Sequence, residues 1–396
     1  MLNIDLLPQP LRSDEKGQKR CCLLQQTTAS GKMTEKALWF LYPANLPMPE
    51  DDDCDAYLLA TLLPAMQMRA AIHVHGSVSH ELLANLTELQ YVWNKWLPER
   101  YFLIDIQVDR IRESDVQVDG AIAAFSGGVD AQFTAYRHAT GRARYATRNI
   151  KAGVFVHGFD IPLEDTKGFA SAAKIAANTL ADINIELLPV ETNIRTLWSI
   201  NWEDYHAAAI ASVLCGLKRY AGIGLIGSGD SYDVLISPWG SHPITDPLLS
   251  SGDFRLIHDG AGFSRSEKIQ TLSAWPLGIE GLRFCWAGDQ NDSNCGRCEK
   301  CVRTRLNFLV AGIDNPQCFS EPMDSSLFKS MALKGRAVSI DWKLIRHEMI
   351  KTGRGLEWLP YIEKALKRKP PPNLNRLFPV GSRRRMWVKK LLMRNE

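Results

Sequence analysis

Four cysteines lie within seventeen residues in the last third of the sequence. They are Cys285, Cys295, Cys298 and Cys301, and the last three form a Cys-x2-Cys-x2-Cys run. Such short spacing lets neighbouring thiolates face one ion, and the loop after Cys285 can bring in the fourth sulfur. Four soft ligands favour structural Zn²⁺, while a [4Fe–4S] cluster is an alternative because tight cysteine triplets also hold clusters. Buried free thiols are a poorer explanation of four cysteines so close together.

A second stretch suited to chemistry is Ser126-Gly-Gly-Val-Asp130, which follows the apolar run 121–125 and precedes a helical pattern. Glycine lets the backbone turn tightly and approach a phosphate, and the first amides of a helix favour negative charge. A carboxylate at position 130 would repel phosphate unless a divalent cation such as Mg²⁺ lies between them. No Gly-Lys-Ser/Thr follows, so this is not a Walker loop. The alternative is an ordinary junction between a strand and a helix.

The loop resembles the Ser-Gly-Gly-x-Asp-Ser/Thr motif of the N-type ATP pyrophosphatases, also called PP-loop enzymes. Ser126, Gly127, Gly128 and Asp130 match that motif, whereas Ala131 replaces its final hydroxyl residue. Enzymes of this kind cleave ATP between the α and β phosphates and leave AMP on a substrate. The resemblance therefore implies an ATP site with one hydroxyl fewer in the pyrophosphate cradle.

The cysteine cluster extends this resemblance. A PP-loop followed by the pattern that ends in Cys295-Gly-x-Cys-x2-Cys301 is similar to the 7-cyano-7-deazaguanine synthase family, over residues 120–312. Enzymes of that family use ATP and ammonia to convert a carboxylated deazaguanine to a nitrile, and four cysteines hold their structural zinc. Phe284 departs from the small polar residue usual there. The N-terminal part and the basic C-terminal end have no place in the compact family enzyme, so the resemblance is to a divergent relative.

Two further segments carry the resemblance more weakly. Residues 263–269 are similar to the family's Thr-Lys-Ala-Glu-Ile segment, with Arg265 in place of the lysine that balances charge near the phosphates. Residues 239–246 weakly resemble the family's substrate loop, but its second Cys-Arg pair is absent. The implied catalytic residues are Asp130, Arg265 and Lys268.

The chemistry that the resemblance implies is adenylation of a carboxylate or carbonyl oxygen, followed by displacement of AMP by ammonia or another nucleophile. The loop would hold the phosphates, and the adenine would lie against the ends of neighbouring strands. The implied cofactors are ATP, Mg²⁺ and Zn²⁺. The implied nucleotide-binding residues are Ser126, Gly127, Gly128, Val129, Phe155, Val156, His157, Gly227 and Ser228.

The elements that must position these residues alternate between strand and helix. Apolar runs predict strands at 121–125, 153–157, 185–190 and 222–227, with helices at 167–182 and 202–219 between them. Such alternation predicts an α/β fold with a doubly wound parallel sheet. Ligands of these sheets bind at the carboxyl ends of the strands, so the segments that follow each strand are candidate walls of the site. A further hypothesis places His206 against the substrate.

The chain divides by pattern into five parts. We expect a polar segment at 1–36, with residues 13–20 least ordered, and a small α/β unit at 37–115. The ATP-binding domain would span 116–282, the zinc segment 283–320, and a helical, basic tail 321–396. In the small unit, His73 and His75 alternate along a predicted strand and could bind a metal, although surface histidines explain them more simply.

Composition is that of a soluble globular protein, and neither a secretory signal nor a membrane-length apolar run is evident, which predicts a cytoplasmic location. Residues 364–396 contain eleven Lys and Arg residues and one acid, so this segment carries +10 although the whole chain carries only +3. It favours a nucleic acid or an acidic partner, or is simply solvated. The acceptor stays open, and a homodimer is implied only by the resemblance.

Three other functions fit parts of the sequence. One is a nucleotide-binding regulatory or defence protein without turnover, which Ala131 favours; another is a nucleic-acid-modifying relative that uses the basic tail. A minor alternative is a hydrolase with Ser231 in a Gly-Asp-Ser block and His242 or His258 as its partner. The glycines at 222–227 match the dinucleotide fingerprint, but they lie inside a predicted strand rather than after it.

Overall fold

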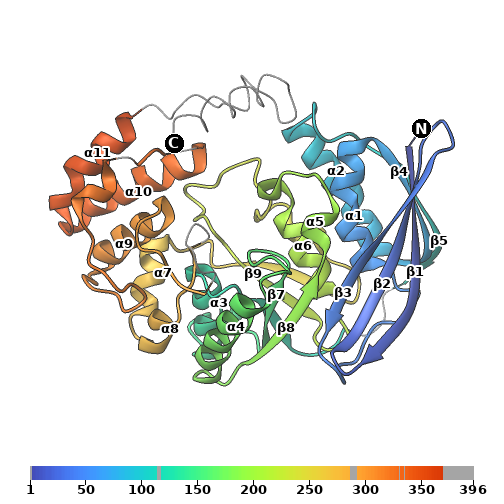
Figure 1. Cartoon of the computed structure of the whole chain (residues 1–396), viewed down its shortest axis with the longest axis horizontal. Helices are drawn as coiled ribbons and strands as arrows, with labels where there is room; N and C mark the ends of the chain where they lie inside the picture. The colour runs from blue at the N-terminus through green and yellow to red at the C-terminus, as the bar shows by residue number, and fades with distance from the viewer. Residues whose placement is uncertain (1, 114–116, 286–291, 330, 334, 369–396) are drawn as a thin grey trace, which may run out of the picture. The chain divides into compact units, whose positions relative to one another are not determined.

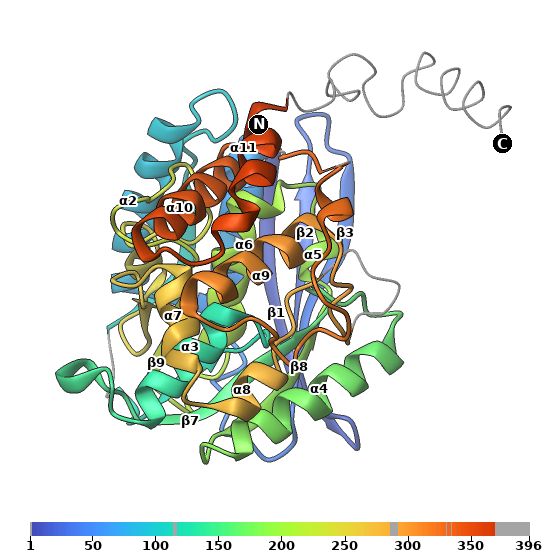
Figure 2. The same cartoon turned by 90° about the vertical axis from the view of Figure 1, so that its left-hand side faces the viewer.

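The computed structural model describes residues 2–113, 117–285, 292–329, 331–333 and 335–368. The chain forms two compact units, residues 1–322 and 323–396. Figures 1 and 2 show two views of the chain at right angles to each other. The first unit holds the strands and α1–α9, and the second contains α10 and α11.

The described strands of the first unit form a single sheet in the order β10-β9-β6-β7-β8-β3-β2-β1-β4-β5. The strands are β1 (Leu2–Asp14), β2 (Gly17–Thr27), β3 (Met33–Tyr42), β4 (Ala70–Ser79), β5 (Ile106–Arg112), β6 (Ala121–Ala124), β7 (Ile150–His157), β8 (Glu186–Thr192), β9 (Ile223–Gly227) and β10 (Arg255–Asp259). The helices are α1 (Asp55–Met68), α2 (His80–Trp96), α3 (Val129–Ala139), α4 (Thr166–Ala181), α5 (Ile194–Leu197), α6 (Trp202–Cys215), α7 (Arg265–Leu272), α8 (Pro276–Glu280), α9 (Glu299–Ala311), α10 (Arg336–Thr352) and α11 (Leu359–Lys367). Short 3-10 turns lie at Arg144–Ala146, Asp246–Leu249, Ser325–Phe328 and Leu356–Trp358.

Strands β6 to β10 are parallel to one another, and helices cover both of their faces. Ala123 and Phe125 at β6 pack with α3 and α4 on one face, while Ile122 belongs to the core that contains α6 on the other. Strand β6 pairs with β7 on one side and with β9 on the other. The chain builds the sheet outward from β6 through β7 and β8, and then returns to the other side of β6 to add β9 and β10. The prediction of a mostly parallel α/β sheet is confirmed, and β6 lies where such sheets bind ligands.

The first 27 residues differ from the sequence prediction. Residues 13–20, expected to be the least ordered, lie largely in β1 and β2, which pair antiparallel as a long hairpin. Gly17 follows its turn with a φ of +141°, and a Cβ there would lie 2.1 Å from the carbonyl oxygen of Tyr42. The segment reads as polar because only one face of each strand is buried, through side chains such as Ile4 and Leu24.

The small α/β unit predicted at 37–115 shares the sheet with the rest of the first unit. Strand β3 pairs antiparallel with β8 at Phe40 and Leu41, and this pairing joins the two halves. Helices α1 and α2 pack on one face, and α1 lies against α6. Strand β5 begins at Ile106, and one buried core runs through both halves.

The second unit is held together by aromatic side chains. Phe328 stacks on Trp358 with ring centroids 5.7 Å apart, and it also contacts Trp342 and Tyr361. The predicted basic tail starts in α11 at Lys364, but from residue 369 it lies outside the described residues. Among the helices that the structure describes, none is both long and apolar enough to cross a membrane.

Candidate active site

The loop after β6 has the backbone geometry of an anion site. Gly127 adopts a φ of +77°, a conformation that side-chain-bearing residues rarely adopt, and Gly128 caps α3 in an extended conformation. The backbone N–H of Arg283 donates to the carbonyl of Gly127 at 2.8 Å, and the N–H of Gly128 donates to Oγ of Ser126 at 3.3 Å. These bonds fix the turn, so that the N-terminus of α3 faces the carboxyl ends of the strands.

Two cations from α7 hold Asp130 in the first turn of α3. Nζ of Lys268 lies 3.0 Å from Oδ1 of Asp130, and a guanidinium nitrogen of Arg265 lies 3.1 Å from Oδ2. A capping box between Ser264 and Glu267 begins α7 and places both cations one turn apart on the same face. Burial opposes ionisation of Asp130, but these two cations outweigh it and lower the pKa of the carboxyl group. Asp130 is therefore a carboxylate at neutral pH.

A cavity of about 370 Å³ extends from this loop along the ends of β6, β7 and β9. One end is polar, with Ser126, Asp130, Arg283 and Lys300 around it, and a smaller hollow beside it also contacts Arg265. The other part is mostly apolar and aromatic. Its walls include Phe155, Val156, Phe159, Trp202, His206, Ile210, Val213, Gly227 and Trp239, with Glu203 and Ser241 as polar groups.

Most of the sequence-predicted residues meet at this cavity. Ser126, Asp130, Phe155, Val156 and Gly227 line it, and Gly128 and Arg265 line the adjoining hollow. Gly127 shapes the turn behind them. The backbone of Asp130 passes so close to position 227 that only glycine fits there, since a Cβ would lie 2.6 Å from the carbonyl oxygen of Asp130.

Four predicted residues stand behind the cavity wall. The side chain of Val129 is buried in the core with Ile269, so only its backbone faces the loop. The side chain of Lys268 is 1% exposed, and its ammonium group donates to the carbonyl oxygen of Ser228 as well as to Asp130. The ring of His157 stacks on Phe169 at 4.2 Å, and its Nε2 lies 2.9 Å from the carbonyl oxygen of Pro162. These side chains support the site rather than line it.

Two cations at the cavity escaped the sequence analysis. Arg283 donates from its guanidinium to the carbonyl of Ser126 at 3.2 Å, and burial lowers its pKa. Lys300 lies in the first turn of α9, where burial and the nearby Arg265 lower its pKa to about 7. Both lie close to a cysteine of the cluster in sequence, since Arg283 precedes Cys285 by two positions and Lys300 immediately precedes Cys301. A basic residue beside a predicted metal ligand was the available signal.

The four predicted cysteines converge beside the active-site cavity. Their sulfurs lie within 4.8 Å of one another, with 3.7 Å between Cys285 and Cys298 and 3.8 Å between Cys295 and Cys301. Tetrahedral bonds of about 2.3 Å from zinc to sulfur separate the sulfurs by about 3.8 Å, so the four thiols fit one Zn²⁺. A hydrogen bond from Cys301 lowers the pKa of Cys298 to about 5, which favours the thiolate that metals bind. In a four-iron cluster each thiolate binds a different iron, which this close packing does not suit.

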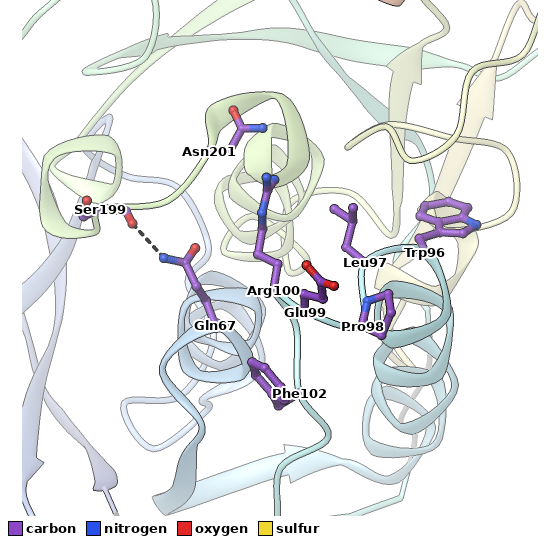
Figure 3. Close-up of a pocket in the computed structure, with 9 residues that line it drawn as sticks. All are labelled: Gln67, Trp96, Leu97, Pro98, Glu99, Arg100, Phe102, Ser199 and Asn201. Carbon is purple, nitrogen blue, oxygen red and sulfur yellow. Dashed lines mark hydrogen bonds between the residues drawn. The ribbon is translucent and has the colours of Figure 1, made fainter. Parts of the chain in front are cut away.

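A larger cavity lies elsewhere in the first unit and has different walls (Figure 3). It measures about 630 Å³ and is bordered by the end of α2, by Gln67 of α1 and by the segment that precedes α6. Gln67 donates to the carbonyl of Ser199 at 3.0 Å, and Arg100 forms an ion pair with Asp204. No residue predicted to do chemistry lines it, so we place the candidate active site at the loop.

Comparison with known proteins gives one partial similarity. No family model matches the chain, and no solved structure matches it. The 7-cyano-7-deazaguanine synthase of Methanothermobacter thermautotrophicus is 34% identical over 67 residues. The match covers 17% of this chain and 29% of that protein, so the chain spans less than a third of the relative's length. This similarity is to an enzyme, and it supports at most a distant PP-loop relationship.

Proposed function

We propose that the chain binds ATP with Mg²⁺ at the loop and transfers AMP to an oxygen of an acceptor, with release of pyrophosphate. The observation that carries the proposal is that Arg265, Arg283 and Lys300 converge with the loop at the N-terminus of α3 on the small polar hollow. Backbone amides and three basic side chains suit a triphosphate, and the aromatic part of the adjoining cavity suits flat rings. The similarity to an ATP-using synthase agrees with this assignment.

In the proposed reaction, a carboxylate or carbonyl oxygen of the acceptor attacks the α-phosphorus. The bond from that phosphorus to the bridging oxygen breaks, and pyrophosphate leaves with the electron pair. Ser126 and the amides that follow Gly127 would bind the leaving group, while Arg265 and Lys300 offset its charge. In this proposal Asp130 would hold Mg²⁺, which would neutralise the phosphates when bound. Attack by ammonia or another nucleophile on the adenylated carbon then displaces AMP.

Nucleotide binding tests the site without knowledge of the acceptor. The non-cleavable analogue α,β-methylene ATP, titrated with Mg²⁺ in a calorimeter, should bind the wild-type chain. Arg265→Ala should weaken binding about tenfold to hundredfold, because a charge-assisted hydrogen bond contributes about 1.5–3 kcal/mol. Arg142→Ala is the matched control, since Arg142 is exposed and lies outside the cavity. Equal affinity in all three proteins would place the nucleotide elsewhere.

A second candidate function is nucleotide binding without turnover, as in a regulatory or defence protein. Ala131 favours it, since this side chain lines the cavity at the position where the PP-loop motif has a hydroxyl. Both functions predict that the chain binds the ATP analogue, but only the first predicts that products form from ATP. A chain that binds the analogue but releases neither AMP nor pyrophosphate from ATP, with acceptors supplied, would favour the second.

A further inference from the structure

A histidine and aspartate cluster lies on the N-terminal half of the sheet, away from the loop. Asp5 on β1 and His73 on β4 are direct partners in the parallel pairing of these strands. His75 follows two residues later on the same face, and Asp109 comes from the neighbouring β5. The regular pairing of β1 with β4 fixes the backbone at Asp5 and His73, while His75 and Asp109 lie where the register between β4 and β5 shifts. We name Asp5, His73, His75 and Asp109 the β4 cluster.

Each imidazole of the β4 cluster lies between two carboxylates. On one side, Nε2 of His73 lies 2.9 Å and Nδ1 of His75 3.3 Å from the carboxylate oxygens of Asp109. On the other side, Nε2 of His75 lies 3.2 Å and Nδ1 of His73 3.8 Å from Oδ1 of Asp5. The two rings are 4.1 Å apart. All four ring nitrogens therefore face a carboxylate.

This arrangement has a surplus of lone pairs. A neutral imidazole carries one N–H donor and one acceptor nitrogen, so each ring can donate to only one of its two carboxylates. If both rings donate to Asp109, two nitrogen lone pairs and a carboxylate oxygen converge at Asp5. A cation bound beside Asp5 would accept these lone pairs and resolve the conflict.

We propose that the β4 cluster binds a divalent transition-metal ion, with Oδ1 of Asp5, Nδ1 of His73 and Nε2 of His75 as its ligands. These three ligand groups lie within 4.8 Å of one another. Imidazole and carboxylate ligands suit Zn²⁺, Ni²⁺ and Co²⁺. Asp109 accepts the remaining N–H of both rings, and a carboxylate in this position orients metal-binding histidines and makes them better ligands.

The position of the β4 cluster leaves the metal open to solvent. Along β4 the buried side chains alternate with the two histidines, and Ile72 and Val74 face the core that contains α1 and α2. Figure 1 shows these helices on one side of this part of the sheet and no described helix on the other. The histidine side chains are 33% and 34% exposed. Three protein ligands and an accessible fourth position are typical of metal sites that exchange a water.

Titration with Ni²⁺ tests the proposal. The full chain is first brought to one tightly bound zinc per chain and freed of weakly bound metal, so that the cysteine site is filled and the β4 cluster is empty. Calorimetry should detect about one added Ni²⁺ per chain, and Ni²⁺ should raise the melting temperature. The double variant His73→Gln with His75→Gln should lose both effects. Asp109→Asn should weaken binding about tenfold to hundredfold, which is the usual effect of removing such a supporting carboxylate.

The matched control is His80→Gln, because His80 is an exposed histidine outside the β4 cluster. It should bind Ni²⁺ as the wild type does. Asp5→Asn provides a milder variant if the double substitution lowers the yield of folded chain, and it should also weaken binding. Absence of added Ni²⁺ in the wild type, or equal binding by the wild type, Asp5→Asn and the double variant, would overturn the proposal. These measurements do not use ATP, so their result is independent of whether the proposed function is correct.

Discussion

At the residue scale, the geometry around Asp130 decides what the loop can do. Its carboxylate is held in place by Lys268 and Arg265 from α7. The sequence predicted these three residues as a set, through the resemblance of two short motifs. It placed His157 among the nucleotide-binding residues as well, although that ring stacks on Phe169. Strand patterns indicate where a side chain is along the chain, but packing with distant elements decides which way it points.

Asp130→Asn should remove ATP turnover, because the amide is a poor ligand for Mg²⁺ and leaves Lys268 without its anionic partner. We expect the free energy of unfolding at pH 7 to fall by about 1–3 kcal/mol, with the fold retained. Turnover assays and urea denaturation measure the two effects. Asp233→Asn, a change at an exposed aspartate, is the control and should alter neither.

The stability difference should depend on pH in a defined direction. The pKa of Asp130 is lowered in the folded chain, so its ion pairs stabilise the fold fully above the unfolded-state pKa of about 3.9. That contribution is lost as the pH falls through the lower folded-state pKa. The wild type and Asp130→Asn should therefore converge in stability in acid. A difference that persists unchanged at pH 3 would show that the ion pairs are not its cause.

At the element scale, the cysteine cluster adjoins the start of α9, which contributes Lys300 to the candidate site. Cys298 is the N-cap residue of α9, and Lys300 lies in the first turn of that helix. The sequence predicted both the metal site and the loop, yet it did not link them, because no local pattern shows that α9 packs against α7. It also missed β1 and β2, since strands with one buried face carry few apolar residues. The available signal was the alternation of apolar and polar residues that is typical of a half-buried strand, as at Leu2, Ile4 and Leu6 in β1.

Metal analysis should find about one tightly bound zinc per chain, and Cys298→Ser should lose it. Because the metal fixes the start of α9, the variant should also bind α,β-methylene ATP more weakly and melt at a lower temperature. Cys21→Ser is the control, as Cys21 is a half-buried cysteine on β2 outside the cluster. Iron in place of zinc would contradict the metal assignment. Unchanged nucleotide affinity in the zinc-free variant would contradict the link between the two sites.

At the scale of the whole molecule, a buried group of charges connects distant parts of the first unit. Nζ of Lys218, 1% exposed, lies 2.8 Å from Asp55 and 3.2 Å from Asp253, and it also pairs with Asp53. Arg112, at the end of β5, bonds to the same three carboxylates. Burial and Asp53 raise the pKa of Asp55, while the two cations oppose that shift. These contacts join the N-terminal strands to the half of the sheet that carries the loop, which sequence patterns could not reveal.

Lys218→Ala should lower the free energy of unfolding by about 3–5 kcal/mol, because it leaves buried carboxylates without a cation that they share. Urea denaturation monitored by tryptophan fluorescence measures the change. Lys95→Ala, at an exposed lysine on α2, should shift the free energy by less than about 0.5 kcal/mol. Equal stability of the two variants would mean that the buried charges contribute little to joining the halves.

The most direct test of the proposed function is the identity of the products formed from ATP. The chain would be incubated with Mg²⁺, ammonia, a cell extract as a source of acceptors, and ATP labelled at either the α or the γ phosphate. The account predicts that the α label appears in AMP or an adenylated acceptor, and the γ label in pyrophosphate. Asp130→Asn, assayed in parallel, should form neither product. Release of ADP and phosphate by the wild type, absent from the variant, would contradict cleavage between the α and β phosphates.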